Sequence, residues 1–249
     1  MEILIPILIV GVLVLIIWGA IAAHKAHKAR IAALSAWASS KGWSFSEHDH
    51  AGFDDRYRHF SLFNNGHSRR ASNIIRGELT INRRPHPVVL CDYVYVTTST
   101  DSKGRTTNTH HHHSVCLVHT PYNLPGFTIR REHLFDKIGG ALGFDDIDFE
   151  DAEFSKRFHV KSKDRRFAYD LMSPRMIEYF QELDSRLKGK VPALDLQEGE
   201  LLIYTTGHWK TAHDFQHALD LAEGFIDRFP DHMLAQLEGD SSFRTGIET

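Results

Sequence analysis

The sequence has few cysteines and no large excess of charge of either sign. Only two cysteines, Cys91 and Cys116, occur in 249 residues. So few cysteines exclude a disulfide scaffold and are typical of a reducing compartment, where we expect both thiols to stay free. The formal net charge is -3 and the charged fraction is 24%. A balance of this kind does not predict nucleic acid as a partner.

Short motifs for phosphate binding, calcium binding and nucleophilic catalysis are also missing. Gly139 and Gly140, followed by Gly143, lack both the spacing and the lysine of a P-loop. No G-x-S-x-G nucleophile elbow occurs. The acidic run at residues 145–153 lacks the glycine that an EF-hand loop needs at its sixth position, and it alternates like a charged edge strand. The sequence thus contains no coherent catalytic set, which favours a protein that is not an enzyme.

What the chain does have is a long apolar segment at its start. Residues 3–23 carry no charged side chain, and a helix of that length crosses the roughly 30 Å hydrocarbon core of a bilayer. A cleaved signal peptide is the alternative, because Ala20-Ile21-Ala22 has the small-x-small cleavage pattern. However, signal peptides have a basic start and an apolar core of about 7–15 residues. We therefore predict an uncleaved anchor at residues 1–23 that contacts the lipid bilayer through residues 3–23.

The charges that flank the anchor predict its direction. Lys25, Lys28 and Arg30 follow the apolar segment, whereas only Glu2 precedes it. The positive-inside rule then places the N-terminus outside and the rest of the chain in the cytoplasm. We expect a single-pass protein of the cell inner (plasma) membrane. Three basic residues are fewer than the clusters of about 4–8 that mark anionic-lipid binding, so their predicted role is orientation alone.

Beyond the anchor, the pattern predicts a juxtamembrane helix at residues 24–42, a cytoplasmic domain at 43–237 and a disordered tail at 238–249. Helices are expected near 173–187, where Ser173 and Pro174 form an N-terminal signal, and near 211–229. Strand patterns occur near residues 42–45, 73–82, 88–97, 109–119, 147–151, 158–161 and 200–206. This order predicts an α+β fold, in which an N-terminal transmembrane helix precedes a mainly antiparallel β-sheet domain with two or three packed helices.

Histidine is the outlier of the composition, at 18 residues, and four of them are consecutive: His110, His111, His112 and His113. They fall on the return strand of a predicted β-hairpin that surrounds the polar loop at residues 99–108. Alternation places His110 with His112 on one face and His111 with His113 on the other, each couple about 7 Å apart along the strand. That spacing suits two ligands of zinc or another transition metal, but a third ligand is not identified. An ordinary strand with a polar end, and no cofactor, is the preferred interpretation.

The predicted register of this hairpin bears on the cysteines as well. If the hairpin is symmetric about Lys103-Gly104, Cys91 lies opposite Cys116 and Tyr95 lies opposite His112. Cys116 is then about 13 Å from His112 along the strand, too far to share a metal ion.

A second histidine pair, His213 and His217, has the spacing of a metalloprotease helix. The apolar face of this predicted helix is set by Phe215 and Leu219. At about 100° per residue both histidines point to the opposite side, toward solvent. A catalytic zinc needs ligands that face a cleft, so this interpretation is rejected.

Several segments carry a family resemblance. They are G-W-S-F at 42–45, A-S-N-I-I-R-G at 71–77, C-D-Y-V-Y at 91–95, L-P-G-F-T-I-R-R-E at 124–132 and D-I-D-F-E at 146–150. Together with the anchor they resemble a family of uncharacterised bacterial membrane-anchored proteins, over most of the chain to Leu187. Residues 151–178 are also similar to a pattern in a broader group of domains of unknown function. The resemblance implies an architecture and supplies no catalytic residue.

We therefore expect a membrane-anchored cytoplasmic interaction or scaffold domain with an unknown protein partner. The alternative is a metal-dependent enzyme, or a metal or pH sensor, centred on residues 110–113, because an excess of imidazoles can change the net charge between about pH 5 and 8.

Overall fold

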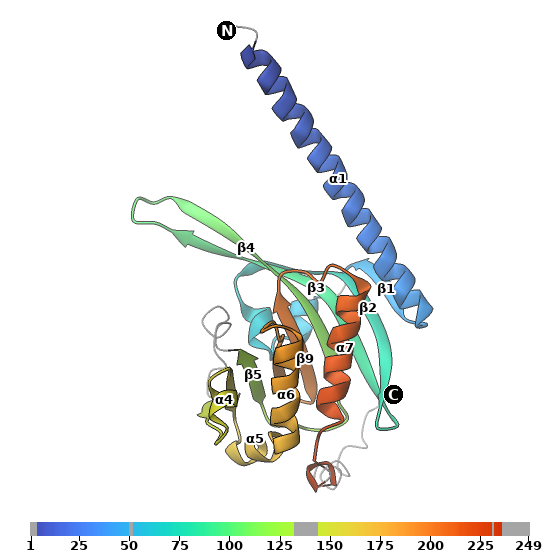
Figure 1. Cartoon of the computed structure of the whole chain (residues 1–249), viewed down its shortest axis with the longest axis vertical. Coiled ribbons are helices and arrows are strands. Elements are labelled where there is room, and N and C mark those ends of the chain that lie inside the picture. Colours follow the sequence, from blue (N-terminus) through green and yellow to red (C-terminus); the bar gives the residue numbers. More distant parts are fainter. Residues whose placement is uncertain (1–3, 50–51, 132–143, 231, 236–249) are drawn as a thin grey trace.

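The computed structural model describes residues 4–49, 52–131, 144–230 and 232–235. A long N-terminal helix, α1 (Leu4–Ser40), projects from a domain built on one β-sheet (Figure 1). The predicted boundary between the anchor and the juxtamembrane helix falls inside this one continuous helix. At 1.5 Å per residue its 37 residues extend about 55 Å. The predicted disordered tail lies outside the described residues.

The described side chains of the apolar part of α1, from residue 11 onward, are exposed. Side chains from Val12 to Trp18 are about half or more exposed, whereas Leu34 and Ala38 near the other end are buried against the domain. This helix is long and apolar enough to cross a membrane, or to serve as a signal sequence. Exposing so many large aliphatic side chains to water costs free energy, so this part of α1 is more stable in an apolar environment.

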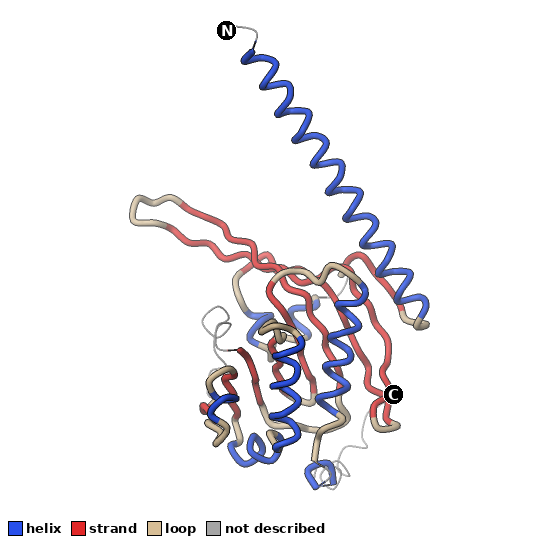
Figure 2. The backbone as a smooth tube through the Cα atoms, in the orientation of Figure 1, coloured by secondary structure: helices blue, strands red, loops and turns tan. Residues whose placement is uncertain are grey.

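The sheet of the described chain has nine strands, all paired antiparallel, in the order β1-β2-β3-β4-β9-β8-β5-β7-β6 (Figure 2). The strands are β1 (Ser44–His48), β2 (His67–Ile81), β3 (Arg84–Thr100), β4 (Thr106–His119), β5 (Phe127–Arg131), β6 (Asp145–Ile147), β7 (Phe158–Ser162), β8 (Ala193–Gln197) and β9 (Glu200–Thr206). The helices of the domain are α2 (Phe53–Arg56), the 3-10 turn η1 (Ser61–Asn64), α4 (Ala152–Ser155), α5 (Arg165–Leu171), α6 (Pro174–Arg186) and α7 (Ala212–Ile226). The predicted α+β class with a mainly antiparallel sheet is confirmed.

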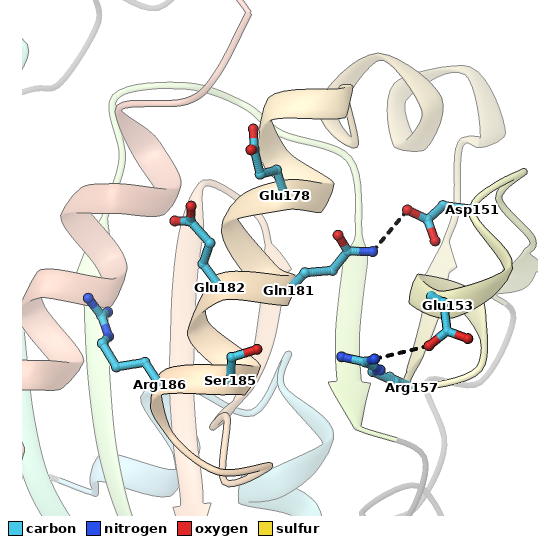
Figure 3. Close-up of a pocket in the computed structure, with 8 residues that line it drawn as sticks. All are labelled: Asp151, Glu153, Arg157, Glu178, Gln181, Glu182, Ser185 and Arg186. Atoms are coloured by element: carbon cyan, nitrogen blue, oxygen red, sulfur yellow. Dashed lines mark hydrogen bonds and ion pairs between the residues drawn. The ribbon is translucent and has the colours of Figure 1, made fainter.

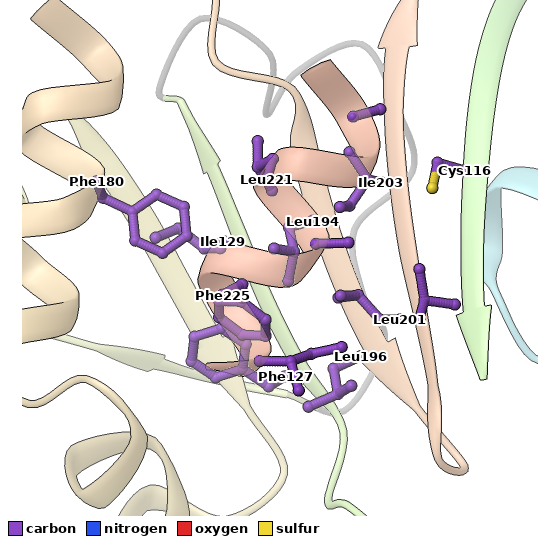
Figure 4. Close-up of a cluster of buried hydrophobic side chains, with 14 of the residues drawn as sticks. Cys116, Phe127, Ile129, Phe180, Leu194, Leu196, Leu201, Ile203, Leu221 and Phe225 are labelled. Atoms are coloured by element: carbon purple, nitrogen blue, oxygen red, sulfur yellow. The ribbon is translucent and has the colours of Figure 1, made fainter. Parts of the chain in front are cut away.

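The sheet is covered on both faces. On one face α6 and α7 pack against the strands. Phe180 of α6 lies beside Ile129 (Figure 4), and Phe225 of α7 belongs to the same buried cluster, with Leu194 and Ile203. Burying a side chain of this size contributes about 2–3 kcal/mol, so this face supplies much of the stability. On the other face α2 and η1 cover β2, β3 and β4 with a smaller aromatic cluster. Its members include Phe53, Tyr57, Phe60, Phe63, Tyr93 and Tyr95.

The two long helices of the domain begin and end where local signals predict. Pro174 occupies the first turn of α6, and Lys188 and Gly189 after it adopt positive φ angles of 50° and 78°. At the start of α7, the Thr211 hydroxyl accepts a hydrogen bond from the Asp214 N–H, and the Asp214 carboxylate accepts one from the Thr211 N–H. This reciprocal capping box satisfies two otherwise unpaired backbone donors.

The β3–β4 hairpin differs from the prediction by one residue of register. Cys91 was expected opposite Cys116, but Cys91 pairs with Val115 and Leu90 pairs with Cys116. The two cysteines therefore point to opposite faces of the sheet and belong to separate core clusters. Both thiols are buried and free, as expected.

The turn explains the shift. It is centred on Lys103 alone rather than on Lys103-Gly104, since Thr100 pairs with Thr106. Oδ1 of Asp101 accepts two hydrogen bonds, from the backbone N–H groups of Lys103 and Arg105, both at 2.9 Å. Such side-chain-to-backbone bonds fix the length of a turn, and turn length fixes hairpin register. As a result Tyr95 lies opposite His111 and not opposite His112.

Candidate functional site

The four consecutive histidines are divided between two environments. The rings of His111 and His113 both stack on Tyr95 of the neighbouring strand, with centroids 4.7 and 5.5 Å apart and interplanar angles of 14° and 7°. His110 and His112 lie on the other face of β4, are exposed, and have ring centroids 6.4 Å apart. The alternation expected from the sequence is therefore present, with Tyr95 occupying the space beside one couple.

His113 is the only member of the four that is buried. Its Nδ1 lies 3.1 Å from the carbonyl oxygen of Thr205, so this nitrogen carries the proton. Burial lowers the pKa of His113 to about 4, because a charged imidazolium loses its hydration there. Near neutral pH this side chain is an uncharged packing residue.

His112 has a third imidazole beside it, that of His208 from the β9–α7 loop. Nε2 of His208 lies 3.1 Å from Nδ1 of His112, and Nδ1 of His208 lies 3.1 Å from Oδ1 of Asp92. Since a carboxylate only accepts, Nδ1 of His208 donates, and in the neutral ring Nε2 accepts from His112. Both nitrogens of His208 are thus in use. In the described part of the chain no group of three His, Cys, Asp or Glu side chains is placed to hold a metal ion.

The second histidine pair has the geometry expected for it. His213 and His217 on α7 are exposed, with ring centroids 3.9 Å apart. The opposite side of the helix buries Phe215 and Leu219.

His208 leads to a connected group of polar side chains, which we call the Asp92 network. Asp92 lies buried in the middle of β3 and accepts hydrogen bonds from four side chains. The donors are Arg30 through two nitrogens (2.7 and 3.0 Å), Asn73 (2.9 Å), Ser114 (2.8 Å) and His208 (3.1 Å). The guanidinium of Arg30 and the hydroxyl of Ser114 extend the network to Trp209, whose carbonyl accepts from Arg30 and whose N–H donates to Ser114.

Local structure explains how each donor reaches Asp92. Arg30 lies one helical turn before the buried Leu34 on α1, so both face the domain. Asn73 has a φ of 52° where the β2–β3 register shifts, and such a bulge re-aims its side chain. Ser114 is the cross-strand partner of Asp92 in the β3–β4 ladder.

The electrostatics of Asp92 indicate a structural coupling role rather than catalysis. Burial on its own raises the pKa of Asp92, but the hydrogen bonds from His208 and Arg30 and the charge of Arg30 outweigh it and hold this pKa well below the usual range. A carboxylate with about four lone-pair positions is saturated by these five contacts. Asp92 therefore stays ionised and has no free position from which to act as a base.

The sequence predicts only an orienting role for Arg30 and does not identify the other members of the network. One signal was present, because Asp92 is a lone acid within the apolar run V-V-L-C-D-Y-V-Y. A charged residue in a buried strand needs a partner. Asn73 and Asp92 also lie in two of the segments that carry the family resemblance, so those segments supply polar contacts as well as packing.

Directly beyond this network the β3–β4 hairpin leaves the sheet. The last pairs that join it to its neighbours are His67 with Val96 and His113 with Thr206. Residues 97–110, which we call the hairpin arm, continue as a two-stranded ribbon and are all exposed (Figure 1). Within the arm, Thr98 donates to Asn108 at 2.7 Å.

A separate open groove lies between α6 and the short α4 helix, with a volume of about 770 Å³ (Figure 3). Gln181 donates to Asp151 across it at 2.9 Å, and Arg157 pairs with Glu153 at 3.0 Å. Four of its eight lining residues are therefore engaged in pairs within the groove.

The comparisons add a fold relationship. No protein-family model and no curated protein sequence matches the chain. A solved structure does: the crystal structure of the mycobacterial trehalose monomycolate transport factor A, TtfA, aligns with a TM-score of 0.57. The chain has a TtfA-like fold. The alignment covers 80% of this chain and 93% of that one, at 12% sequence identity. An identity this low shows a common fold and not a common activity. The resemblance to bacterial membrane-anchored proteins is thus supported for the apolar helix and the fold.

Proposed function

We propose that this protein is a single-pass, membrane-anchored interaction domain that presents the hairpin arm to a protein partner at the same membrane. Its anchor is α1, and the flanking charges favour a domain in the cytoplasm at the bacterial inner membrane. TtfA is described as a transport factor, so the partner we propose is a membrane transport assembly that this protein assists.

The observation that carries the proposal is the exposure of the arm. An isolated two-stranded ribbon is only marginally stable in water, and each of its outer edges is a row of unpaired backbone donors and acceptors. No described strand pairs with the outer edges of residues 97–110. Such an edge can receive a strand from another protein, which adds main-chain hydrogen bonds and a specific register.

The base of the arm supports a role at a membrane. Asp92 and Ser114 lie in the two strands of the arm just inside the sheet, and both are tied to Arg30 of α1 by the network. Because Arg30 follows the apolar segment by only seven residues in sequence, the anchor and the arm are held in a fixed relation. A partner that contacts the arm is then in, or directly beside, the same bilayer.

Site-specific photo-crosslinking in intact cells tests this proposal. A photoreactive amino acid is placed at Ser99 or at Thr107, which are an exposed cross-strand pair in the arm. The matched control is Arg166, which is 85% exposed on α5 at the other end of the domain (Figure 1). We expect a discrete product from both arm positions and none from Arg166.

A shortened arm provides the second readout. Replacing residues 99–107 by a two-residue Asn-Gly turn keeps the sheet and removes the ribbon. We expect this variant to stay in the membrane fraction, to keep its thermal midpoint within about 2 °C, because the arm buries almost no apolar area, and to lose the crosslinked partner. Absence of a product at both arm positions in the full-length chain would overturn the proposal.

A further inference from the structure

A second surface lies on α1, on the side turned away from the Asp92 network. Between α1 and the edge strand β1 runs a groove with a volume of about 670 Å³. From α1 it is lined by His24, His27, Lys28 and Ile31, and from β1 by Phe45 and Glu47. Ile31 and Phe45 are half-buried and form an apolar wall, while the two histidines and Lys28 are exposed.

The position of the groove along α1 matters. His24 directly follows the apolar segment that ends at residue 23, and Lys28 follows it by five residues. At 1.5 Å per residue these side chains begin about 1.5–7.5 Å beyond the hydrocarbon core. The polar headgroup layer on each side of a bilayer is about 5–7 Å thick. If α1 spans the membrane, the cationic end of the groove therefore lies within the headgroup layer.

The charges and the shape fit one class of ligand. No described carboxylate forms an ion pair with Lys28, and imidazole N–H groups and ammonium groups both donate to phosphate oxygens. On the membrane side of Lys28, the exposed apolar side chains of α1 offer contact to the acyl chains. Ile31 and Phe45 lie farther from the hydrocarbon core and offer an apolar wall to the carbons of the headgroup. Glu47 on β1 disfavours a bare inorganic anion, but it can accept from the hydroxyl groups of a headgroup.

We propose that this groove binds the headgroup of an anionic phospholipid that carries hydroxyl groups, of the phosphatidylglycerol class. The inference rests on the proposed membrane anchoring by α1, but it needs no protein partner. It changes the interpretation of the flanking charges. Three basic residues are too few for a polybasic patch, whereas Lys28 with two imidazoles around a groove makes a site for one lipid.

Native mass spectrometry of the delipidated full-length protein in detergent tests the inference. The probes are dioctanoyl phosphatidylglycerol, dioctanoyl phosphatidylcholine and glycerol 3-phosphate. We expect saturable binding of phosphatidylglycerol and no comparable binding of the other two. Phosphatidylcholine has the phosphate but no hydroxyl donor, and glycerol 3-phosphate has no acyl chains, so together they separate a lipid site from a site for free phosphate esters.

A matched pair of variants locates the binding. Lys28→Ala removes the ammonium in the groove, and Lys25→Ala removes the same charge three residues earlier, outside the groove. We expect Lys28→Ala to weaken phosphatidylglycerol binding about fivefold or more, the effect of one basic residue at a membrane surface, and Lys25→Ala to change it less than twofold.

Equal losses in both variants, or equal affinity for all three probes, would overturn the inference. Binding can be lost while the protein stays in the membrane fraction, which would leave the proposed anchored interaction domain intact. A chain that the cell releases from the membrane by cleavage near Ala22 would instead remove the anchoring on which both proposals depend. The arm-shortened variant should bind the lipid as the original chain does.

Discussion

At the scale of single residues, Asp92 is a single buried carboxylate that joins four parts of the fold. Its carboxylate is buried and accepts from α1, β2, β4 and the β9–α7 loop at once. Removing one partner of a buried charge pair leaves the other charge without compensation, and this costs more than the pair itself contributes. The network therefore makes the attachment of α1 to the sheet cooperative with the packing of β3 and β4.

Substitution of Asp92 should be strongly destabilising. We expect Asp92→Asn to lower the free energy of unfolding by about 3 kcal/mol, because Arg30 then faces no negative charge. The measurement is chemical unfolding of the detergent-solubilised protein. Asp54→Asn is the control, since the Asp54–Arg69 ion pair is partly exposed, at 23% and 31%, and should contribute less than about 1 kcal/mol. Similar losses in the two variants would contradict the role assigned to the network.

His113 should make the domain sensitive to acid. Its pKa is about 4 in the folded protein, because of burial, against 6.5 in the unfolded chain. Between these two values the unfolded state binds more protons, so stability falls as the pH drops from about 6.5 to about 4. The full effect is about 3 kcal/mol.

The comparison of His113→Gln with the original chain isolates this contribution. The stability of the variant should depend less steeply on pH between 6.5 and 4, as followed by urea unfolding at several pH values. The titration of Glu200 affects stability in a lower pH range. Burial raises its pKa, but hydrogen bonds from His119 and His59 prevail and lower it from 4.5 to about 2. The stability that Glu200 contributes is lost below pH 4.5. An unchanged slope in His113→Gln would contradict the assignment.

At the scale of elements, the sequence predicted α6, α7 and most strands, because their signals are local. A cap, a proline in the first turn and a regular apolar face are read within one segment. β5 and β8 were missed. In β5 the consecutive residues Phe127, Thr128, Ile129 and Arg130 are all buried, so the strand shows no alternation. In β8, Asp195 is buried because it pairs with Arg130 of β5 at 2.9 Å, and such a pair is invisible in either segment alone.

The register of the hairpin shows the same limit. Nothing in the alternation of residues 88–97 and 109–119 distinguishes a turn centred on Lys103 from one centred on Lys103-Gly104. The choice depends on Asp101, whose side chain accepts two backbone N–H groups. Shifting the register by one residue changes every facing pair. Tyr95 therefore lies opposite His111, where a turn centred on Lys103-Gly104 would place Val96.

The strand β4 should bind metal only weakly. His110 and His112 share a face, but His208, the nearest third imidazole, uses both ring nitrogens within the network. We therefore expect elemental analysis of the protein purified without an affinity tag to find less than about 0.1 equivalent of zinc, nickel or copper, since two exposed histidines make a weak site. Stoichiometric metal that disappears when residues 110–113 become alanine would instead establish the metal-dependent alternative.

At the scale of the whole molecule, the sequence predicted the order of parts: an apolar helix, then a mainly antiparallel α+β domain. It did not predict how these parts are joined, because the joint is made by residues 62 and 179 positions apart from Arg30, namely Asp92 and Trp209. Long-range polar contacts of this kind leave no periodic trace in the chain. The TtfA-like fold, found at 12% identity, is likewise a property of the assembled sheet.

The unbroken course of α1 has a mechanical meaning. One helix runs from the apolar segment to Trp37 and Ala38 in the domain, and Arg30 joins it to Asp92 in the sheet. The direction of the helix is therefore coupled to the direction in which the base of the arm leaves the sheet. Membrane helices tilt to match bilayer thickness, by about 20° on average. If α1 spans a membrane as we propose, a thinner bilayer tilts the domain together with the helix and moves the arm with it. On that proposal, the height of the arm above the membrane plane depends on the thickness of the bilayer.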